Sequence, residues 1–170
     1  PRLRNALVLT LVALAGAASA SEQAALEPYV VTATRQPVDP LLVPTAVDVI
    51  SARELHRAQP AIHLSESLYR IPGVVARDRW NYAQDLQISI RGFGARSAFG
   101  VRGVQLFTDG IPATMPDGQG QVSHFMLESA SRIEVLRGPF SALYGNASGG
   151  VIEVFTMDAP AVPSLRAGYV

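Results

Sequence analysis

The sequence contains no cysteine and no lysine among its 170 residues. Without cysteine the chain has no disulfide, no thiolate nucleophile and no cysteine ligand for zinc. All 14 basic residues are therefore arginine, whose planar guanidinium suits carboxylates and phosphates wherever it faces a ligand. The 14 acidic residues balance them, and the formal net charge at pH 7 is zero. That balance argues against nucleic acid or an anionic lipid surface as the main partner.

Recognisable catalytic and cofactor motifs are also missing. Neither GxSxG nor HExxH is present, and the three histidines lie far apart. A GxGxxG dinucleotide loop beginning at Gly92 would need glycine at position 97, which is Ser97. His63 and Glu66 are three residues apart on an expected helix, but one such pair does not bind a metal on its own. The sequence therefore predicts no enzyme, no metal site and no bound cofactor.

The apolar run at the N-terminus is too short to cross a membrane as a helix. Two arginines precede it, positions 6–17 are almost entirely Ala, Leu, Val and Gly, and Ala18-Ser19-Ala20 follows. A transmembrane helix needs about 20 apolar residues. A charged start, a short apolar core and an A-x-A end are instead typical of a secretory signal peptide. We therefore expect residues 1–20 to be a signal peptide.

The segment 21–44 is expected to be a flexible arm, because it contains four prolines and no helical period. Within it, Tyr29-Val30-Val31-Thr32 has high β-propensity but no strand partner nearby in the sequence. An extended apolar segment of this kind can add itself as a strand to the sheet edge of another protein. An ordinary first strand of the domain is the alternative.

Short strands and short helices alternate through the rest of the chain. The connections between them are too short for a doubly wound fold, so the expected fold class is α+β, a small mixed β-sheet with short helices. Strands are predicted where apolar and polar residues alternate with period two or where β-branched residues dominate. These segments are 46–50, 74–77, 86–90, 104–108, 132–137 and 151–155.

Four helical segments are expected between these strands. A capping box formed by Ser51 and Glu54 predicts a helix that extends through about Gln59. Pro60 begins a second helix, whose apolar face carries residues 64, 68 and 71 and which ends at the Pro-Gly pair 72–73. Single helical turns are expected within 122–129 and 140–144.

Residues 81–121 hold the two central strands and the two most glycine-rich loops. The strands 86–90 and 104–108 flank a loop with several glycines and arginines, and a second Gly/Pro-rich loop covers 109–120. We expect both strands to lie in one short sheet that presents these loops at its edge, where binding residues often lie. A hairpin with an irregular connection and no ligand is the alternative.

Arginine is concentrated in this part of the chain. Between residues 77 and 102, five arginines face only two aspartates. At loop tips they could hold a polycarboxylate through bidentate hydrogen bonds, while Trp80, Tyr82 and Phe99 stack on a planar ligand. Alternatively, the aromatic rings pack beneath the loops and the arginines beside the strands, Arg91 and Arg102, form internal ion pairs. The acidic partners available for such pairs are Glu134, Glu153 and Asp109.

Several short motifs occur in a characteristic order along the chain. They are EPYVVTA at 27–33, LYRIPGV at 68–74, IRGFG at 90–94, DGIP at 109–112, IEVLRGP at 133–139, SALYG at 141–145 and GGVI at 149–152. Together they resemble the plug domain of a TonB-dependent outer-membrane receptor. In this resemblance, the segment 27–33 is similar to the TonB box of the family.

The resemblance implies a domain organisation. Residues 1–20 are then the signal peptide, 21–44 the N-terminal arm with its TonB box at 27–35, and 45–158 the plug. Residues 159–170 are a linker and the truncated first strand of a 22-strand barrel, which the chain is too short to build. The barrel would place the receptor in the outer membrane, with the arm in the periplasm. The expected partners are the TonB protein, which pairs with the arm, the receptor's own C-terminal barrel and a small-molecule substrate.

The resemblance also implies binding residues. The expected TonB-binding residues are Glu27, Pro28, Tyr29, Val30, Val31, Thr32 and Ala33. The expected ligand-binding residues, all on the loops of the central region, are Arg79, Trp80, Tyr82, Gln84, Arg96, Phe99, Met115, Asp117 and Gln119.

The function implied is that of a plug that gates energy-coupled uptake of a small ligand. The loops at 81–94 and 109–121 are similar to those of receptors that import pyrroloquinoline quinone, a small planar molecule with three carboxylates. A ferric-siderophore receptor is the first alternative, and a secreted binding module that works alone is the second.

Overall fold

The computed structural model describes residues 35–39, 42–57, 61–78, 80, 85–98 and 100–160. The expected signal peptide, the TonB-box segment 27–33 and the stretch 161–170 lie outside these residues, so those expectations stay predictions. Within the described part of the chain, no helix has the length and apolar character needed to span a membrane.

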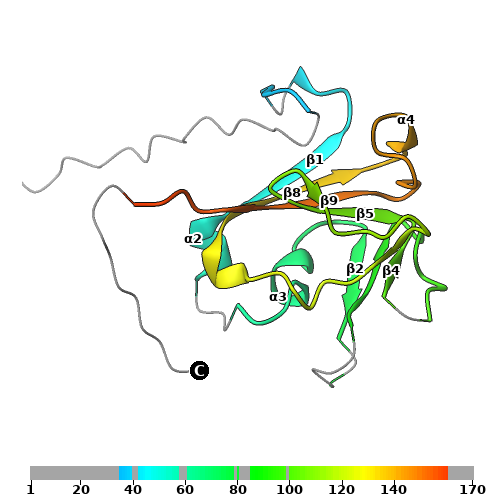
Figure 1. The fold of residues 1–170 in the computed structure, drawn as a ribbon, viewed down its shortest axis with the longest axis horizontal. Coiled ribbons are helices and arrows are strands. Elements are labelled where there is room, and N and C mark those ends of the chain that lie inside the picture. The colour runs from blue at the N-terminus through cyan, green and yellow to red at the C-terminus, as the bar shows by residue number, and fades with distance from the viewer. Residues whose placement is uncertain are drawn as a thin grey trace, which may run out of the picture.

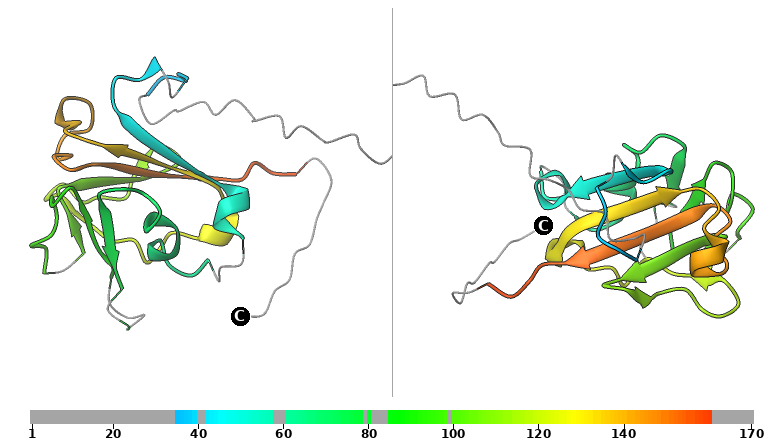
Figure 2. Two further views of the ribbon diagram at one scale, coloured as in Figure 1. Left: turned by 180° about the vertical axis from the view of Figure 1, so that it is seen from behind. Right: turned by 90° about the horizontal axis from the view of Figure 1, so that it is seen from above.

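A five-stranded mixed sheet forms the centre of the fold. Its strands lie in the order β1 (Ala46–Ser51), β8 (Ala130–Arg137), β9 (Gly150–Thr156), β5 (Val104–Thr108) and β6 (Ile111–Pro112). Only β5 and β9 run parallel, and the other neighbours are antiparallel. Figure 2 shows these strands side by side from above. β9, the last strand of the described residues, thus lies between strands that precede it, and the mixed α+β class is confirmed.

Two small sheets and four short helical segments complete the described part of the chain. β2 (Val74–Arg77) pairs with β3 (Gln87–Ile90), and β4 (Val101–Arg102) pairs with β7 (Gln119–Gly120), both antiparallel. The helical segments are α2 (Ala52–Leu55), α3 (Ser65–Leu68), the 3-10 turn η2 (Leu127–Ser129) and α4 (Ser141–Tyr144). The turns expected within 122–129 and 140–144 are therefore present.

Both faces of the large sheet are covered in its middle. We call the face with Ile133 and Ile152 the inner face; it packs on α2, α3 and the two small sheets, which lie below the sheet in Figure 1. The opposite, outer face carries Leu136 and Val151, which pack against Tyr144 of α4 above the sheet. Because side chains alternate along a strand, β8 and β9 supply both layers.

The first two helices are shorter than the sequence predicted. The capping interaction of α2 is present, because the Ser51 N–H donates to Glu54 Oε2 at 2.9 Å. This bond is also the main cause of the lowered pKa of Glu54. The helix nevertheless ends at Leu55 instead of Gln59. His56 leaves the helical path, and its Nε2 lies 3.2 Å from the carbonyl oxygen of Leu127.

The second helix is confined to α3 instead of starting at Pro60. The carboxylate of Glu66 accepts the backbone N–H groups of Ala61, Ile62 and His63 at 2.9, 3.2 and 3.1 Å. This loop of N–H donors wraps around the carboxylate and replaces the expected first helical turn. The predicted apolar face is nevertheless correct, since residues 64, 68 and 71 are all buried.

The expectation that the two central strands share a sheet is wrong. β3 pairs with β2, whereas β5 lies in the large sheet between β9 and β6. β9 adds in parallel to one edge of β5, and the tight turn at Asp109-Gly110 folds β6 back along the other edge. Both turn residues have positive φ, as a two-residue hairpin of type I′ requires. No edge of β5 is left for β3.

Candidate ligand-binding site

The loop that follows β3 is held against the strand it leaves. The side-chain amide of Gln87 donates to the carbonyl oxygens of Ala95 and Ser97 at 2.7 and 3.1 Å. Gly94 fits where it does because it has no side chain. Its φ is +87°, and a Cβ there would lie 2.6 Å from the carbonyl oxygen of Ile88. The backbone of this loop is therefore fixed, while the side chain of Arg96 is exposed.

The loop before β7 meets this first loop through the small β4–β7 sheet. Arg102 and Gln119 are register partners, and the Arg102 guanidinium donates to Gln119 Oε1 at 3.0 Å. The carboxylate of Asp117 lies 3.7 Å from the same guanidinium. Asp117 also accepts the Gln119 backbone N–H at 3.0 Å, which orients the carboxylate locally. Two of the expected ligand-facing loops are thus brought together.

A hollow of about 460 Å³ opens beside these contacts. Its walls are residues 92–97 together with Arg102 and Gly103. The two ionisable residues in these walls, Arg96 and Arg102, both carry positive charge. Backbone from a glycine-rich loop and two guanidinium groups form a surface suited to an anionic ligand.

The expected ligand-binding residues are only partly described. Trp80 is 95% exposed, and Met115 is also exposed, at 55%. Arg96, Asp117 and Gln119 lie at or beside the hollow. The remaining expected residues lie outside the described part of the chain: Arg79, Tyr82, Gln84 and Phe99.

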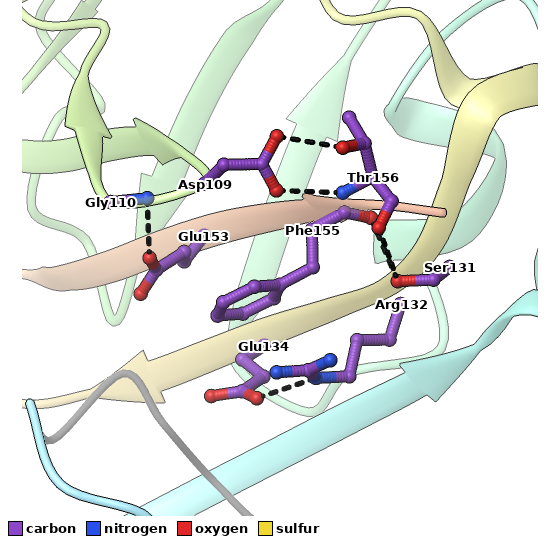
Figure 3. A network of polar contacts seen from close by, with 8 residues as sticks. All are labelled: Asp109, Gly110, Ser131, Arg132, Glu134, Glu153, Phe155 and Thr156. Carbon is purple, nitrogen blue, oxygen red and sulfur yellow. Dashed lines mark hydrogen bonds and ion pairs between the residues drawn. The ribbon is translucent and has the colours of Figure 1, made fainter. Parts of the chain in front are cut away.

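The ion pairs differ from those considered for the sequence. The carboxylate of Asp109 accepts the backbone N–H and the hydroxyl of Thr156, both at 2.8 Å, and Glu153 accepts the N–H of Gly110 at 3.1 Å. Glu134 is 2.8 Å from Nε of Arg132. Figure 3 shows these groups around β8 and β9, where Glu134 and Glu153 alternate with the inner-face residues and so lie on the outer face. The carboxylates suggested as partners for Arg91 and Arg102 therefore make other contacts.

This outer-face network contains two buried carboxylates. Glu134 and Glu153 are register partners on β8 and β9 and are 0% and 6% exposed. Burial raises the pKa of Glu153, and the charge of Glu134 raises it further. The Arg132 guanidinium lies 3.8 Å above the ring of Phe155, beside Glu134. The sequence signal that could have revealed this pair is that each of the two strands carries a glutamate, and that both glutamates fall on the same face of the sheet.

A second cleft, of about 370 Å³, lies at the opposite end of the large sheet beside β6. Exposed Ile111 and Met126 border it together with buried Phe125, and its walls are mainly apolar. The described residues include no group of three His, Cys, Asp or Glu side chains that could hold a metal ion. The arginine-lined hollow is therefore the better candidate for a charged ligand.

The model of the TonB-dependent receptor plug domain matches residues 39–151, and the chain belongs to this family. The match covers every strand and helix named above except β9, of which only the first two residues fall within it.

Solved receptors share the fold. The chain is 28% identical to a variant of the ferric enterobactin receptor PfeA from Pseudomonas aeruginosa, covering 78% of this chain and 20% of that one with a TM-score of 0.56. It is 29% identical to the siderophore receptor PirA from Acinetobacter baumannii, with 67% and 17% covered and a TM-score of 0.52. For the ferric yersiniabactin uptake receptor FyuA from Yersinia pestis, the identity is 27%, the coverage 69% and 18%, and the TM-score 0.52. The chain spans about a fifth of the length of these receptors.

Proposed function

We propose that the chain is the plug of an outer-membrane transporter and gates the energy-coupled uptake of a small anionic ligand. The observation that carries this proposal is a hollow lined by Arg96 and Arg102, in a domain whose family is that of receptor plugs. A second loop reaches the rim of this hollow through the contacts of Asp117 and Gln119 with Arg102. The arm 21–44 reaches into the periplasm, the plug covers 45–158, and a barrel that holds the plug in the outer membrane follows 159–170.

The ligand is either pyrroloquinoline quinone or a ferric siderophore. The three carboxylates of the quinone suit a hollow with two guanidinium groups. The siderophore alternative is favoured by the structural neighbours, which are receptors for ferric enterobactin and ferric yersiniabactin. Titration of the purified full-length receptor with pyrroloquinoline quinone and with ferric enterobactin distinguishes them. Submicromolar binding of one compound alone identifies the class.

The TonB protein is the proposed source of energy, and it pairs with residues 27–33 as an added strand. Ligand binding favours the state of the plug that binds the ligand more tightly. In this proposal, that state is the one in which residues 27–33 are released. Val31 lies in the middle of the segment, where a strand needs its N–H.

The arm's role is tested by Val31→Pro in the full-length receptor. Proline removes the N–H donor, so uptake should fall by roughly tenfold or more while the ligand Kd stays within about twofold. Ala24→Pro, in the arm but before the segment, is the matched control and should leave uptake intact. Undiminished uptake by the Val31 variant would show that this segment is not the coupling element. A stand-alone secreted module predicts no uptake by either protein.

A further inference from the structure

We propose that Arg102 is a specificity-determining residue that exchanges the carboxylate of Asp117 for an anionic group of the ligand. The inference rests on the proposed function and refines it, because it gives Asp117 the role of an internal competitor. Asp117 was expected to contact the ligand directly. The ligand group is a carboxylate or another oxyanion that a guanidinium can bind with two parallel hydrogen bonds.

The geometry of the Arg102–Asp117 pair is that of a loose, replaceable contact. The two groups are 3.7 Å apart, and their side chains are 53% and 55% exposed. At this distance the pair is held by charge and not by a short hydrogen bond. Exposed ion pairs contribute little to stability, since water solvates both charges well. A ligand oxyanion can therefore displace Asp117 without disturbing the fold.

Two other ion pairs of the described residues are tighter. Arg132 reaches Glu134 at 2.8 Å, and Arg137 reaches Asp48 at 2.7 Å with both side chains largely shielded. Arg137 also donates to the carbonyl oxygen of Pro72 at 2.7 Å. Arg137 thereby links β8 to β1, and Arg132 lies close to a buried carboxylate, whereas Arg102 is loosely paired.

Arg102 is nevertheless well positioned. Its backbone lies in the β4–β7 ladder, and Gln119 accepts from its guanidinium at 3.0 Å on one side. The guanidinium has further N–H groups, so it can keep Gln119 and still offer two donors to a ligand. Arg96 in the wall of the same hollow adds a second positive charge. A ligand with two or more negative groups fits this arrangement.

Asp117 is held outside the hollow that Arg102 lines. One carboxylate oxygen accepts the Gln119 N–H, and the loop is closed by the Met115 N–H, which donates to the Gln119 carbonyl oxygen at 2.8 Å. The next residue, Gly118, is buried with φ +80° against the side chain of Asn146, which fixes the loop further. The negative charge therefore stays at the rim, where it competes with a ligand for Arg102.

The test is a set of binding titrations with the purified full-length receptor. The probes are pyrroloquinoline quinone, ferric enterobactin and citrate, the last a tricarboxylate without a ring. For the probe that binds, Arg102→Ala should weaken affinity by roughly tenfold to a hundredfold, because charge-assisted hydrogen bonds are lost. Asp117→Asn should tighten binding by up to about fivefold, because the competitor is removed. Arg102→Lys should restore only part of the loss, since lysine has no planar fork.

Matched controls remove the same charges elsewhere. Arg53→Ala on α2 and Glu128→Gln on η2 change exposed residues far along the chain from the hollow, and both should leave affinity within about twofold. Weaker binding by Asp117→Asn would overturn the inference, because it would mean that Asp117 supports the ligand. An affinity unchanged by Arg102→Ala, or a wild-type receptor that binds none of the three anions, would overturn it too.

The outcome is separable from that of the proposed function. Binding reports on Arg102 and Asp117, whereas the loss of uptake in the Val31 variant reports on energy coupling. A receptor whose uptake depends on Val31 but whose affinity ignores Arg102 overturns this inference alone.

Discussion

Two arginines of this plug, Arg132 and Arg102, differ in their burial and in how closely each is paired with a carboxylate. Arg132 lies over Phe155 on the outer face of the large sheet, 2.8 Å from a fully buried glutamate. Arg102 lies at the rim of a hollow, half exposed and 3.7 Å from its aspartate. The difference is set by burial, since a carboxylate removed from water needs a close positive partner and an exposed one does not.

The comparison separates framework from binding surface. The outer-face network ties β9 to the turn at Asp109-Gly110, and Arg132 over Phe155 links β8 to β9, so it stabilises one arrangement of strands. The loop side is built with a fixed backbone and a weakly paired side chain. Both features suit the proposed function, in which the loops accept a ligand while the sheet keeps its form.

The largest expected effect is the loss of Arg132. Replacing it with alanine removes the guanidinium from Glu134, which is 0% exposed, and should lower the free energy of unfolding by about 3 kcal/mol. Arg102→Ala is the matched control and should cost about 1 kcal/mol or less. Urea unfolding of the chain measures both. Equal costs would abolish the distinction between the two arginines.

A smaller effect is expected at the loop backbone. Gly92 and Gly94 have nearly the same positive φ, +88° and +87°, so alanine is strained equally at both. A Cβ at Gly92 has no atom within 4 Å, whereas one at Gly94 approaches the carbonyl oxygens of Ile88 and Arg102 at 2.6 and 2.8 Å. Gly94→Ala should therefore destabilise the chain by about 2 kcal/mol more than Gly92→Ala. Urea unfolding of the two variants side by side gives this difference, and equal midpoints would contradict the close fit of Gly94.

The smallest effect is a dependence on pH. The pKa of Glu153 is raised by burial, then by Glu134 and Asp109, while the Gly110 N–H and Arg132 oppose the rise. A carboxyl with a raised folded pKa favours the folded state when protonated, so its ionisation lowers stability as pH rises from the unfolded value through the folded one. Glu153→Gln, which keeps an acceptor for Gly110, should gain stability over wild type near pH 7 and lose that gain near about pH 4. Unfolding midpoints at the two pH values measure it, and a gain that ignores pH would count against the buried charge.

The strands could be predicted from the sequence because each one has its own pattern of apolar and β-branched residues, which can be recognised without knowing its partners. β1, β5 and β8 alternate with period two and β9 is rich in β-branched residues, and the structure places all four within a residue or two of the expected bounds. The family could also be identified, because its motifs mark the turns between these strands. The loops of the candidate site were located for the same reason.

The partners of the strands and side chains could not be predicted. Nothing in the spacing of β3 and β5 indicates that β9 would add to β5 and exclude β3. The helix expected from Pro60 failed because Glu66 offers its carboxylate to three N–H groups, a tertiary choice that propensity does not include. The partners of Arg102 could not be foreseen, because Asp117 and Gln119 lie on a separate loop further along the chain.

The strand order also dictates an order of assembly. β8 and β9 are joined by a short local segment and pair antiparallel, so their contact closes quickly at low entropic cost. β1 and β8 are far apart in the sequence, since Ser51 is the register partner of Arg132. β8 is the one neighbour of β1 among the strands described. β1 therefore docks late. The N-terminal arm leads directly into β1. Detaching β1 from β8 therefore reverses a late step of folding and leaves the β8–β9 pair in place.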